Sequence, residues 1–194
     1  MSKLVYGVGV NDLAGEEGKS DFYRKWAGML ERCYSARYLE KRPSYKGCTV
    51  CPEWLTFSNF KAWMKDQDYQ GKQLDKDILI PGNRIYSPDT CTFISCQLNT
   101  FLIESGSIRG AYPIGVDFHR KTNKFRAQCN TSGARKTLGY FDTAEEAHTA
   151  WLAEKQAQAR VFAVQQEDPR VSFALLARYE NYQMNDVRGA EHDQ

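Results

Sequence analysis

Two groups of side chains in this 194-residue chain have the chemistry to bind phosphate or metal. Between His119 and Thr137 every charged side chain is cationic, with no Asp or Glu: Arg120, Lys121, Lys124, Arg126, Arg135 and Lys136. Cations seek phosphate oxygens, and the amides of Gln128 and Asn130 can read base edges. This first group predicts a nucleic-acid-binding surface. The alternative is an ordinary solvated basic face.

Cysteines form the second group. Cys48-x-x-Cys51 and Cys91-x-x-x-x-Cys96 supply four thiols, and four thiolates could hold one structural zinc ion. The second spacing is wider than usual, and Cys91 and Cys96 stand in an apolar run. Buried free thiols are therefore the favoured interpretation, with zinc as the alternative.

Composition limits the class of protein. The net charge is only +2, so any affinity for DNA must come from a local patch and not from a global field. No apolar run approaches the length of a membrane span, and residues 1–11 lack a signal-peptide pattern. We expect a cytoplasmic protein that does not enter a membrane, with its cysteines reduced.

The cationic stretch falls on a predicted three-stranded antiparallel meander. Three runs alternate apolar and polar residues and are separated by turn residues. The expected inward residues are Val116 and Phe118, then Phe125, Ala127 and Cys129, then Leu138 and Tyr140. A helix capped by Asp142 or Thr143 follows, and its apolar residues should cover the inward face. The other face is left with the cations and amides.

This segment resembles the DNA-binding domain of plant ethylene-response factors, which recurs in phage homing endonucleases. The resemblance covers about residues 112–160 and rests on Gly115-Val116, Lys124-Phe125-Arg126-Ala127 and the run from Leu138 to His148. It implies that outward residues enter the major groove, and by position these are Asp117, His119, Gln128, Asn130, Arg135 and Thr137. The plant domains place arginine or tryptophan where this chain has Asp117, His119 and Thr137, so their target sequence does not transfer. The expected DNA-binding set is His119, Arg120, Lys121, Lys124, Arg126, Gln128, Asn130, Arg135, Lys136 and Thr137.

Several elements are expected around this sheet. The sequence predicts helices over about residues 20–39, from Thr56 or Ser58 onward, and over 97–104, with strands at 49–51 and 74–79. A final helix over 171–182 is expected to pack through Phe173, Leu176 and Tyr179. Leu175 and Leu176 would equally suit a dimer contact, so the oligomeric state stays open.

The segment from Leu74 to Phe101 resembles the ββα-metal (HNH) nuclease motif in the order of its parts. These are Leu74-Asp75-Lys76-Asp77-Ile78 for the first strand, Asn83 or Asp89 for the loop and Asn99 for the helix. The resemblance implies a divalent ion, Mg²⁺ or Mn²⁺, on Asp75 and Asn99. The family's histidine falls at Lys76, which its acidic neighbours should keep charged, so Tyr86 is the candidate for a replacement base. The expected catalytic set is Asp75, Lys76, Tyr86 and Asn99.

Together these features predict an α+β protein with a degenerate ββα-metal (HNH-like) module followed by a three-stranded antiparallel sheet packed on a helix. The expected parts are an extended lead-in (1–19), the HNH-like module (20–104), a linker (105–111), the sheet and helix (112–165) and a C-terminal helix and tail (166–194). The expected function is that of a phage-type HNH-like homing endonuclease, a hydrolase that nicks or cleaves double-stranded DNA. Two alternatives stay open: a catalytically inactive DNA-binding regulator or inhibitor, with a host protein as a possible partner, and no relation to the nucleases at all.

Overall fold

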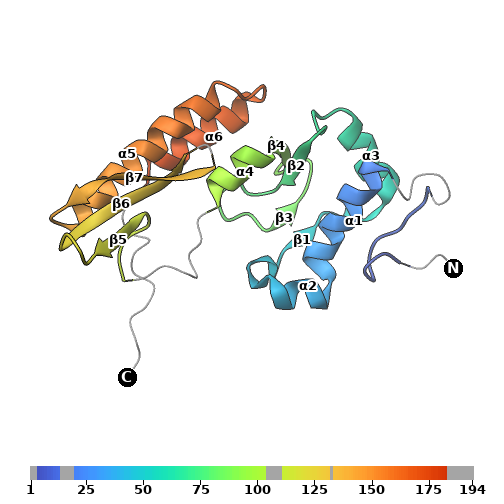
Figure 1. Cartoon of the computed structure of the whole chain (residues 1–194). Helices are drawn as coiled ribbons and strands as arrows, with labels where there is room; N and C mark the ends of the chain where they lie inside the picture. Colours follow the sequence, from blue (N-terminus) through green and yellow to red (C-terminus); the bar gives the residue numbers. More distant parts are fainter. Residues whose placement is uncertain (1–3, 14–19, 104–110, 132, 183–194) are drawn as a thin grey trace. The chain divides into compact units, whose positions relative to one another are not determined.

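The computed structural model describes residues 4–13, 20–103, 111–131 and 133–182, which form a mixture of helices and small sheets (Figure 1). The α+β class expected from the sequence is confirmed. The chain divides into two compact units, 1–99 and 100–194. The expected linker lies outside the described residues except for Ala111. Within the described part of the chain, no helix has both the length and the apolar character that crossing a membrane requires.

The first unit begins with two helices that meet at one serine. α1 (Asp21–Tyr34) is capped by Ser20, whose hydroxyl accepts a hydrogen bond from the backbone N–H of Tyr23 at 3.2 Å. Ser35 ends α1, and its hydroxyl accepts the N–H of Tyr38 at 3.3 Å to begin α2 (Ala36–Lys41). The single helix expected over residues 20–39 is therefore two helices, because a serine cap offers the backbone an alternative to continuing the helix.

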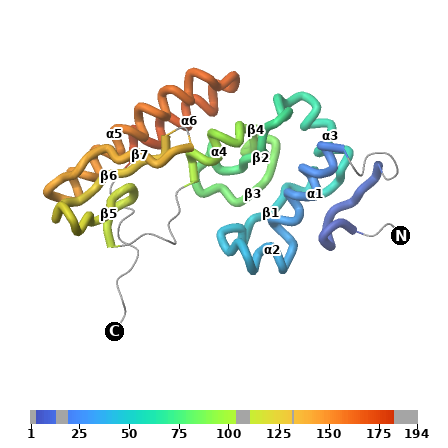
Figure 2. Tube along the Cα trace, in the orientation of Figure 1, coloured from blue at the N-terminus to red at the C-terminus, as the bar shows by residue number. Residues whose placement is uncertain are grey.

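Short strands and helical turns complete this unit. The turns η1 (Pro43–Tyr45) and η2 (Pro52–Leu55) flank β1 (Thr49–Val50), and α3 (Phe57–Lys65) follows. β1 pairs in parallel with β3 (Ile85–Tyr86). β2 (Lys72–Asp75) pairs antiparallel with β4 (Thr92–Ser95), and α4 (Cys96–Leu102) follows β4 directly (Figure 2). The strand expected over 74–79 ends early, at Asp75.

The core of the first unit is aromatic. Trp26 is fully buried, and its indole N–H donates to the carbonyl of Trp54 at 2.7 Å, which joins α1 to η2. The bond satisfies the one polar atom of a large buried ring. The buried cluster comprises Trp26, Met29, Leu30, Cys33, Cys48, Val50, Trp54, Phe57, Phe60, Met64, Leu74, Tyr86, Cys91 and Phe93.

The second unit is a three-stranded antiparallel sheet with two helices. The strands β5 (Val116–His119), β6 (Lys124–Thr131) and β7 (Ala134–Phe141) lie in that order, with β6 in the middle. α5 (Ala144–Ala163) lies along one face of the sheet, and α6 (Pro169–Glu180) packs beside α5 (Figure 1). Thr143 and Glu146 form a capping box at the start of α5, as the Thr-Ala-Glu-Glu sequence favours.

One irregularity in the sheet corrects the expected faces of β7. Ala127 pairs with Gly139, but Gln128 pairs with Thr137, so Leu138 is an extra residue in β7. Such a bulge changes which residues of the strand point to each face. Tyr140, expected to face inward, lies opposite Arg126 and is 44% exposed, so that prediction was wrong.

α6 also packs through a different stripe than expected. Its buried residues are Val171, Leu175 and Tyr179, four apart, whereas Phe173 is 80% exposed. Side chains four residues apart lie above one another on the same face of a helix. Phe173 is two residues from both Val171 and Leu175, so it lies off that face. The expectation that Phe173 packs against the fold was wrong, although Tyr179 was assigned correctly.

Candidate functional site

The outer face of the sheet, the side away from α5, carries the polar residues of β6. Ala127 and Cys129 are buried, and the Gln158 amide of α5 donates to the Cys129 sulfur at 3.6 Å. Because successive side chains of a strand alternate between faces, Arg126, Gln128 and Asn130 point to the outer face. The sequence pattern predicted this alternation on β6.

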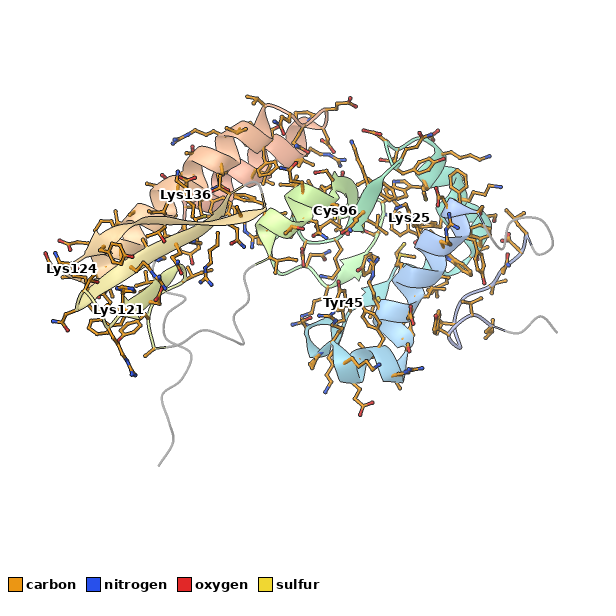
Figure 3. All side chains as sticks on the ribbon, viewed as in Figure 1. Lys25, Tyr45, Cys96, Lys121, Lys124 and Lys136 are labelled. Atoms are coloured by element: carbon orange, nitrogen blue, oxygen red, sulfur yellow. The ribbon has the colours of Figure 1, made fainter. Side chains whose placement is uncertain are left out.

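β7 presents Arg135 and Thr137 to the same face but not Lys136. Arg135 and Thr137 pair with Asn130 and Gln128, whereas Lys136 pairs with the buried Cys129. Directly opposite residues share a face of the sheet. Lys136 lies 3.9 Å from Glu154 of α5, and Figure 3 shows it beside that helix, apart from Lys121 and Lys124. Lys136 therefore lies on the helix side and does not join the expected DNA-binding set.

Several outer-face side chains are held by neighbours. The Gln128 amide donates to the Thr137 hydroxyl at 3.3 Å. The His119 ring lies 5.1 Å from that of Tyr140, and its Nδ1 lies 2.9 Å from the Thr122 hydroxyl. Lys124 forms an ion pair with Asp142 at 3.1 Å. Polar groups fixed in this way lose less side-chain entropy on binding a ligand.

The exposed turn between β5 and β6 adds Arg120 and Lys121 to the cations. Asn123 closes this turn with a φ of 55°, a conformation that asparagine tolerates better than most residues. A cavity of about 730 Å³ lies in the same unit. Its walls include four members of the expected DNA-binding set, namely Arg120, Gln128, Asn130 and Arg135. The fold thus brings together cations and amides from the turn and from two strands.

Asp117 also lies on this face, and its pairing with Arg126 was not predicted from the sequence. It lies directly opposite Arg126, which donates to it from Nε at 3.2 Å and from Nη2 at 2.9 Å. The window from His119 to Thr137 contains no acid, but Asp117 stands just before it. The expected hairpin already placed both residues outward on neighbouring strands, and that was the available signal.

The second candidate site surrounds Asp75, the last residue of β2. Its Oδ1 accepts the backbone N–H groups of Asp77 at 3.0 Å and of Ile78 at 2.7 Å. These two bonds turn the chain and end the strand, as Asp side chains commonly do. Burial, together with the neighbouring charge of Asp77, raises the pKa of the Asp75 carboxyl. By accepting these two N–H groups, the Asp75 carboxylate stabilises the loop that follows β2.

Lys76 is held in place by the loop that follows. Its Nζ donates to the Asp77 carboxylate at 2.9 Å and to the carbonyl of Asn83 at 3.0 Å. Burial alone would lower the pKa of Lys76, but the hydrogen bond and charge of Asp77 outweigh it, so the pKa is raised. A lysine that stays protonated cannot accept a proton as a general base.

Tyr86 and Asn99 have hydrogen-bond partners other than Asp75. The Tyr86 side chain is buried in the core, Arg32 lies 3.5 Å from its hydroxyl, and burial raises its pKa. A buried, less acidic phenol is a poor replacement base. The Asn99 amide donates to the side-chain oxygen of Gln73, which lies two residues before Asp75 on β2.

The cysteines of the possible zinc site differ in exposure. Cys48 and Cys91 are buried and Cys96 is exposed at the start of α4, where Gln73 donates to its sulfur at 3.5 Å. Burial raises the pKa of Cys91 to about 12, which suits a neutral thiol. Among the residues described, no three His, Cys, Asp or Glu side chains gather as metal ligands would.

Comparisons with protein-family models, curated proteins and solved structures gave no match to this chain.

Proposed function

We propose that this protein binds double-stranded DNA through the outer face of the β5–β7 sheet. One observation carries the proposal: α5 covers one face of the sheet, while the other face gathers cations and amides. From the strands these are Lys124, Arg126, Gln128, Asn130 and Arg135. Cations position a protein on phosphates, and amides and guanidinium groups read base edges.

The width of the β5–β7 sheet also suits double-stranded DNA. The major groove of B-DNA admits a β-ribbon, and neighbouring strands lie only about 4.8 Å apart. The middle strand, β6, contributes Arg126, Gln128 and Asn130, which would lie nearest the groove floor. Arg120 and Lys121 in the β5–β6 turn would reach the phosphate backbone. Affinity from these contacts is expected to fall with salt, since each neutralised phosphate releases counterions.

Two adjacent residues of β7 provide a matched test. We expect Arg135→Ala to weaken binding to a duplex and to lower the magnitude of the salt slope by about 1, whereas Lys136→Ala has a smaller effect. Fluorescence anisotropy with a labelled duplex at several salt concentrations measures both. Equal effects of the two substitutions would show that the outer face is not the binding surface. Absence of binding in the unmodified protein would refute the proposal and direct the search to protein partners, such as a host protein.

The second candidate is the metal-dependent HNH-like nuclease. It is supported by the antiparallel pair β2 and β4 followed directly by α4, and by Asn83, whose side chain holds the intervening loop. The residues present fit a divalent ion poorly. Oδ1 of Asp75 already accepts two backbone N–H groups, and Lys76 brings a cation into the same loop. We therefore favour a DNA-binding protein whose nuclease site is degenerate.

Supercoiled plasmid with Mg²⁺ or Mn²⁺ distinguishes the two candidates. Binding without nicking is expected for the degenerate site. Nicking that Asp75→Asn abolishes would establish the nuclease, because this isosteric change keeps an oxygen for the two backbone N–H groups and removes the charge a cation needs. Arg135→Ala serves as the comparison, since it should reduce binding while leaving Asp75 untouched.

A further inference from the structure

We propose that Arg126 reads a guanine in the bound duplex and that Asp117 is the residue that positions it for this contact. The inference rests on the proposed DNA binding and adds the base that the surface recognises. Two hydrogen bonds join Arg126 to Asp117 on the outer face.

The guanidinium of Arg126 is held by a residue of the neighbouring strand β5. On β5, Asp117 accepts Nε–H at 3.2 Å and Nη2–H at 2.9 Å. On β7, Tyr140 lies directly opposite Arg126. The Asp117 and Arg126 side chains remain 42% and 27% exposed, so the pair is open to a ligand.

The atoms that Asp117 engages define which atoms are left for a base. A guanidinium is a planar fork of N–H groups, and Asp117 occupies the edge that carries Nε. The remaining N–H groups, on Nη1 and Nη2, lie on the edges directed away from Asp117. Guanine presents two acceptors in the major groove, O6 and N7, at the spacing of an arginine fork. Two parallel hydrogen bonds from one arginine to these atoms are the contact that the fixed geometry favours.

The charge of Asp117 supports base reading over simple phosphate binding. A carboxylate in the middle of a phosphate-binding face repels the DNA backbone and lowers non-specific affinity. The same carboxylate is favourable if it holds Arg126 in the conformation that meets a base edge, because an arginine already ordered loses less entropy on binding. By contrast, Lys124 also has an acidic partner, Asp142, but a lysine offers no planar fork.

Selection of bound duplexes from a randomised library, followed by affinity measurements on the selected sites, tests the proposal. The unmodified protein should select one position as guanine, and replacing that G·C pair should weaken binding about tenfold. Asp117→Ala and Arg126→Ala should both remove the preference at that position. Asp142→Ala is the matched control, because it removes an equal charge from the same unit and should leave the preference intact.

Asp117 is proposed both to repel the DNA backbone and to position Arg126, and the direction of the affinity change tests each role. Asp117→Ala should raise affinity for non-specific duplex while lowering discrimination, whereas Arg126→Ala should lower both. Asp117→Asn, an isosteric change that keeps one acceptor, should retain part of the preference and guards against misfolding of the alanine variant.

Binding without a guanine preference, or a preference that Asp117→Ala and Asp117→Asn leave intact, would overturn the inference and leave the DNA-binding proposal standing. Failure of the unmodified protein to bind any duplex would overturn both.

Discussion

Lys76 and Asn83 bind each other twice. The Lys76 ammonium donates to the main-chain carbonyl of Asn83 at 3.0 Å, and the Asn83 amide donates to the carbonyl of Lys76 at 2.6 Å. Asn83 also donates to the carbonyl of Ile85 at 2.7 Å and accepts its N–H at 3.1 Å. These contacts close the loop between β2 and β3, and the Asn83 side chain makes three of them.

The first prediction concerns that side chain. Asn83→Ala removes three hydrogen bonds and leaves main-chain groups of Lys76 and Ile85 without these partners. We expect a loss of about 2 kcal/mol in the free energy of unfolding, measured by urea denaturation. Asn59→Ala is the control, since Asn59 has one exposed bond, to the carbonyl of Glu53, and should cost less than about 1 kcal/mol. Similar losses in the two variants would contradict the role assigned to Asn83.

The second prediction concerns the pH dependence of stability at Asp75. Burial and the charge of Asp77 raise its pKa, so the folded state holds the proton more tightly than the unfolded state. The unfolded state then binds fewer protons in the window above about pH 4, and the contribution of Asp75 to stability falls as pH rises through its raised pKa. Asp75→Asn removes this titration and keeps an oxygen for the two N–H groups.

Urea unfolding at about pH 4 and pH 7 measures the effect. The variant should gain stability relative to the unmodified protein on going from the lower to the higher pH. Asp68→Asn, at an exposed ion pair with Lys72, is the control and should not reproduce this gain. A variant that loses relative stability as pH rises would show that the charged form of Asp75 stabilises the fold and that its pKa is lowered instead of raised.

The third prediction concerns the approach of Gly115 to the indole of Trp151. Gly115 has a φ of +79°, and a Cβ atom there would lie 2.1 Å from Cδ1 of Trp151. Gly115→Ala should therefore cost about 3 kcal/mol, from both the backbone and the packing. Gly133→Ala has a similar φ of +83° with no atom within 4 Å of the added Cβ, and should cost about 1 kcal/mol. Thermal unfolding followed by tryptophan fluorescence compares them, and equal costs would mean that Trp151 moves aside.

The fourth prediction concerns Lys155, a buried lysine of α5. Its ammonium donates to the carbonyl of Phe101 at 2.7 Å and lies 3.6 Å from the centroid of the Phe101 ring. Lys155→Met keeps most of the length of the side chain and removes the charge, so we expect a loss of about 2 kcal/mol in unfolding free energy. Lys124→Met, at a more exposed ion pair, should change stability by less than about 1 kcal/mol. An unchanged stability for Lys155→Met would show that the apolar stem alone supports the site.

The sheet was predictable because its signals are local. Alternation on β6 and the Thr143 cap of α5 follow from nearest-neighbour chemistry, and the structure confirms both. The faces of Tyr140 and Lys136 could not be read from the same pattern. A bulge is set by how two strands align with each other, and a period-two pattern read along β7 alone does not contain that information.

Around Asp75, the order of strands, loop and helix was predictable from the sequence, but the contacts of the side chains were not. The sequence of strand, loop, strand and helix around it follows from turn residues and apolar runs. Where the side chains of Lys76, Tyr86 and Asn99 point depends on contacts between segments distant in the chain, such as Tyr86 with Arg32 and Asn99 with Gln73. Residue types suggested one shared site, whereas the structure gives Tyr86 and Asn99 partners other than Asp75.

The extra residue in β7 has a consequence for how such a surface changes over evolution. If alternation ran unbroken from Tyr140, Leu138 and Lys136 would take the outer face and Arg135 would lie beside α5. The strand therefore encodes two alternative sets of outer-face residues, and the backbone alignment selects between them. A point substitution in β7 alters one outer-face residue, whereas a one-residue shift in the alignment of β7 with β6 exchanges the whole set of outer-face residues. A single inserted or deleted codon in this strand would therefore change the outer-face residues of β7 as a set.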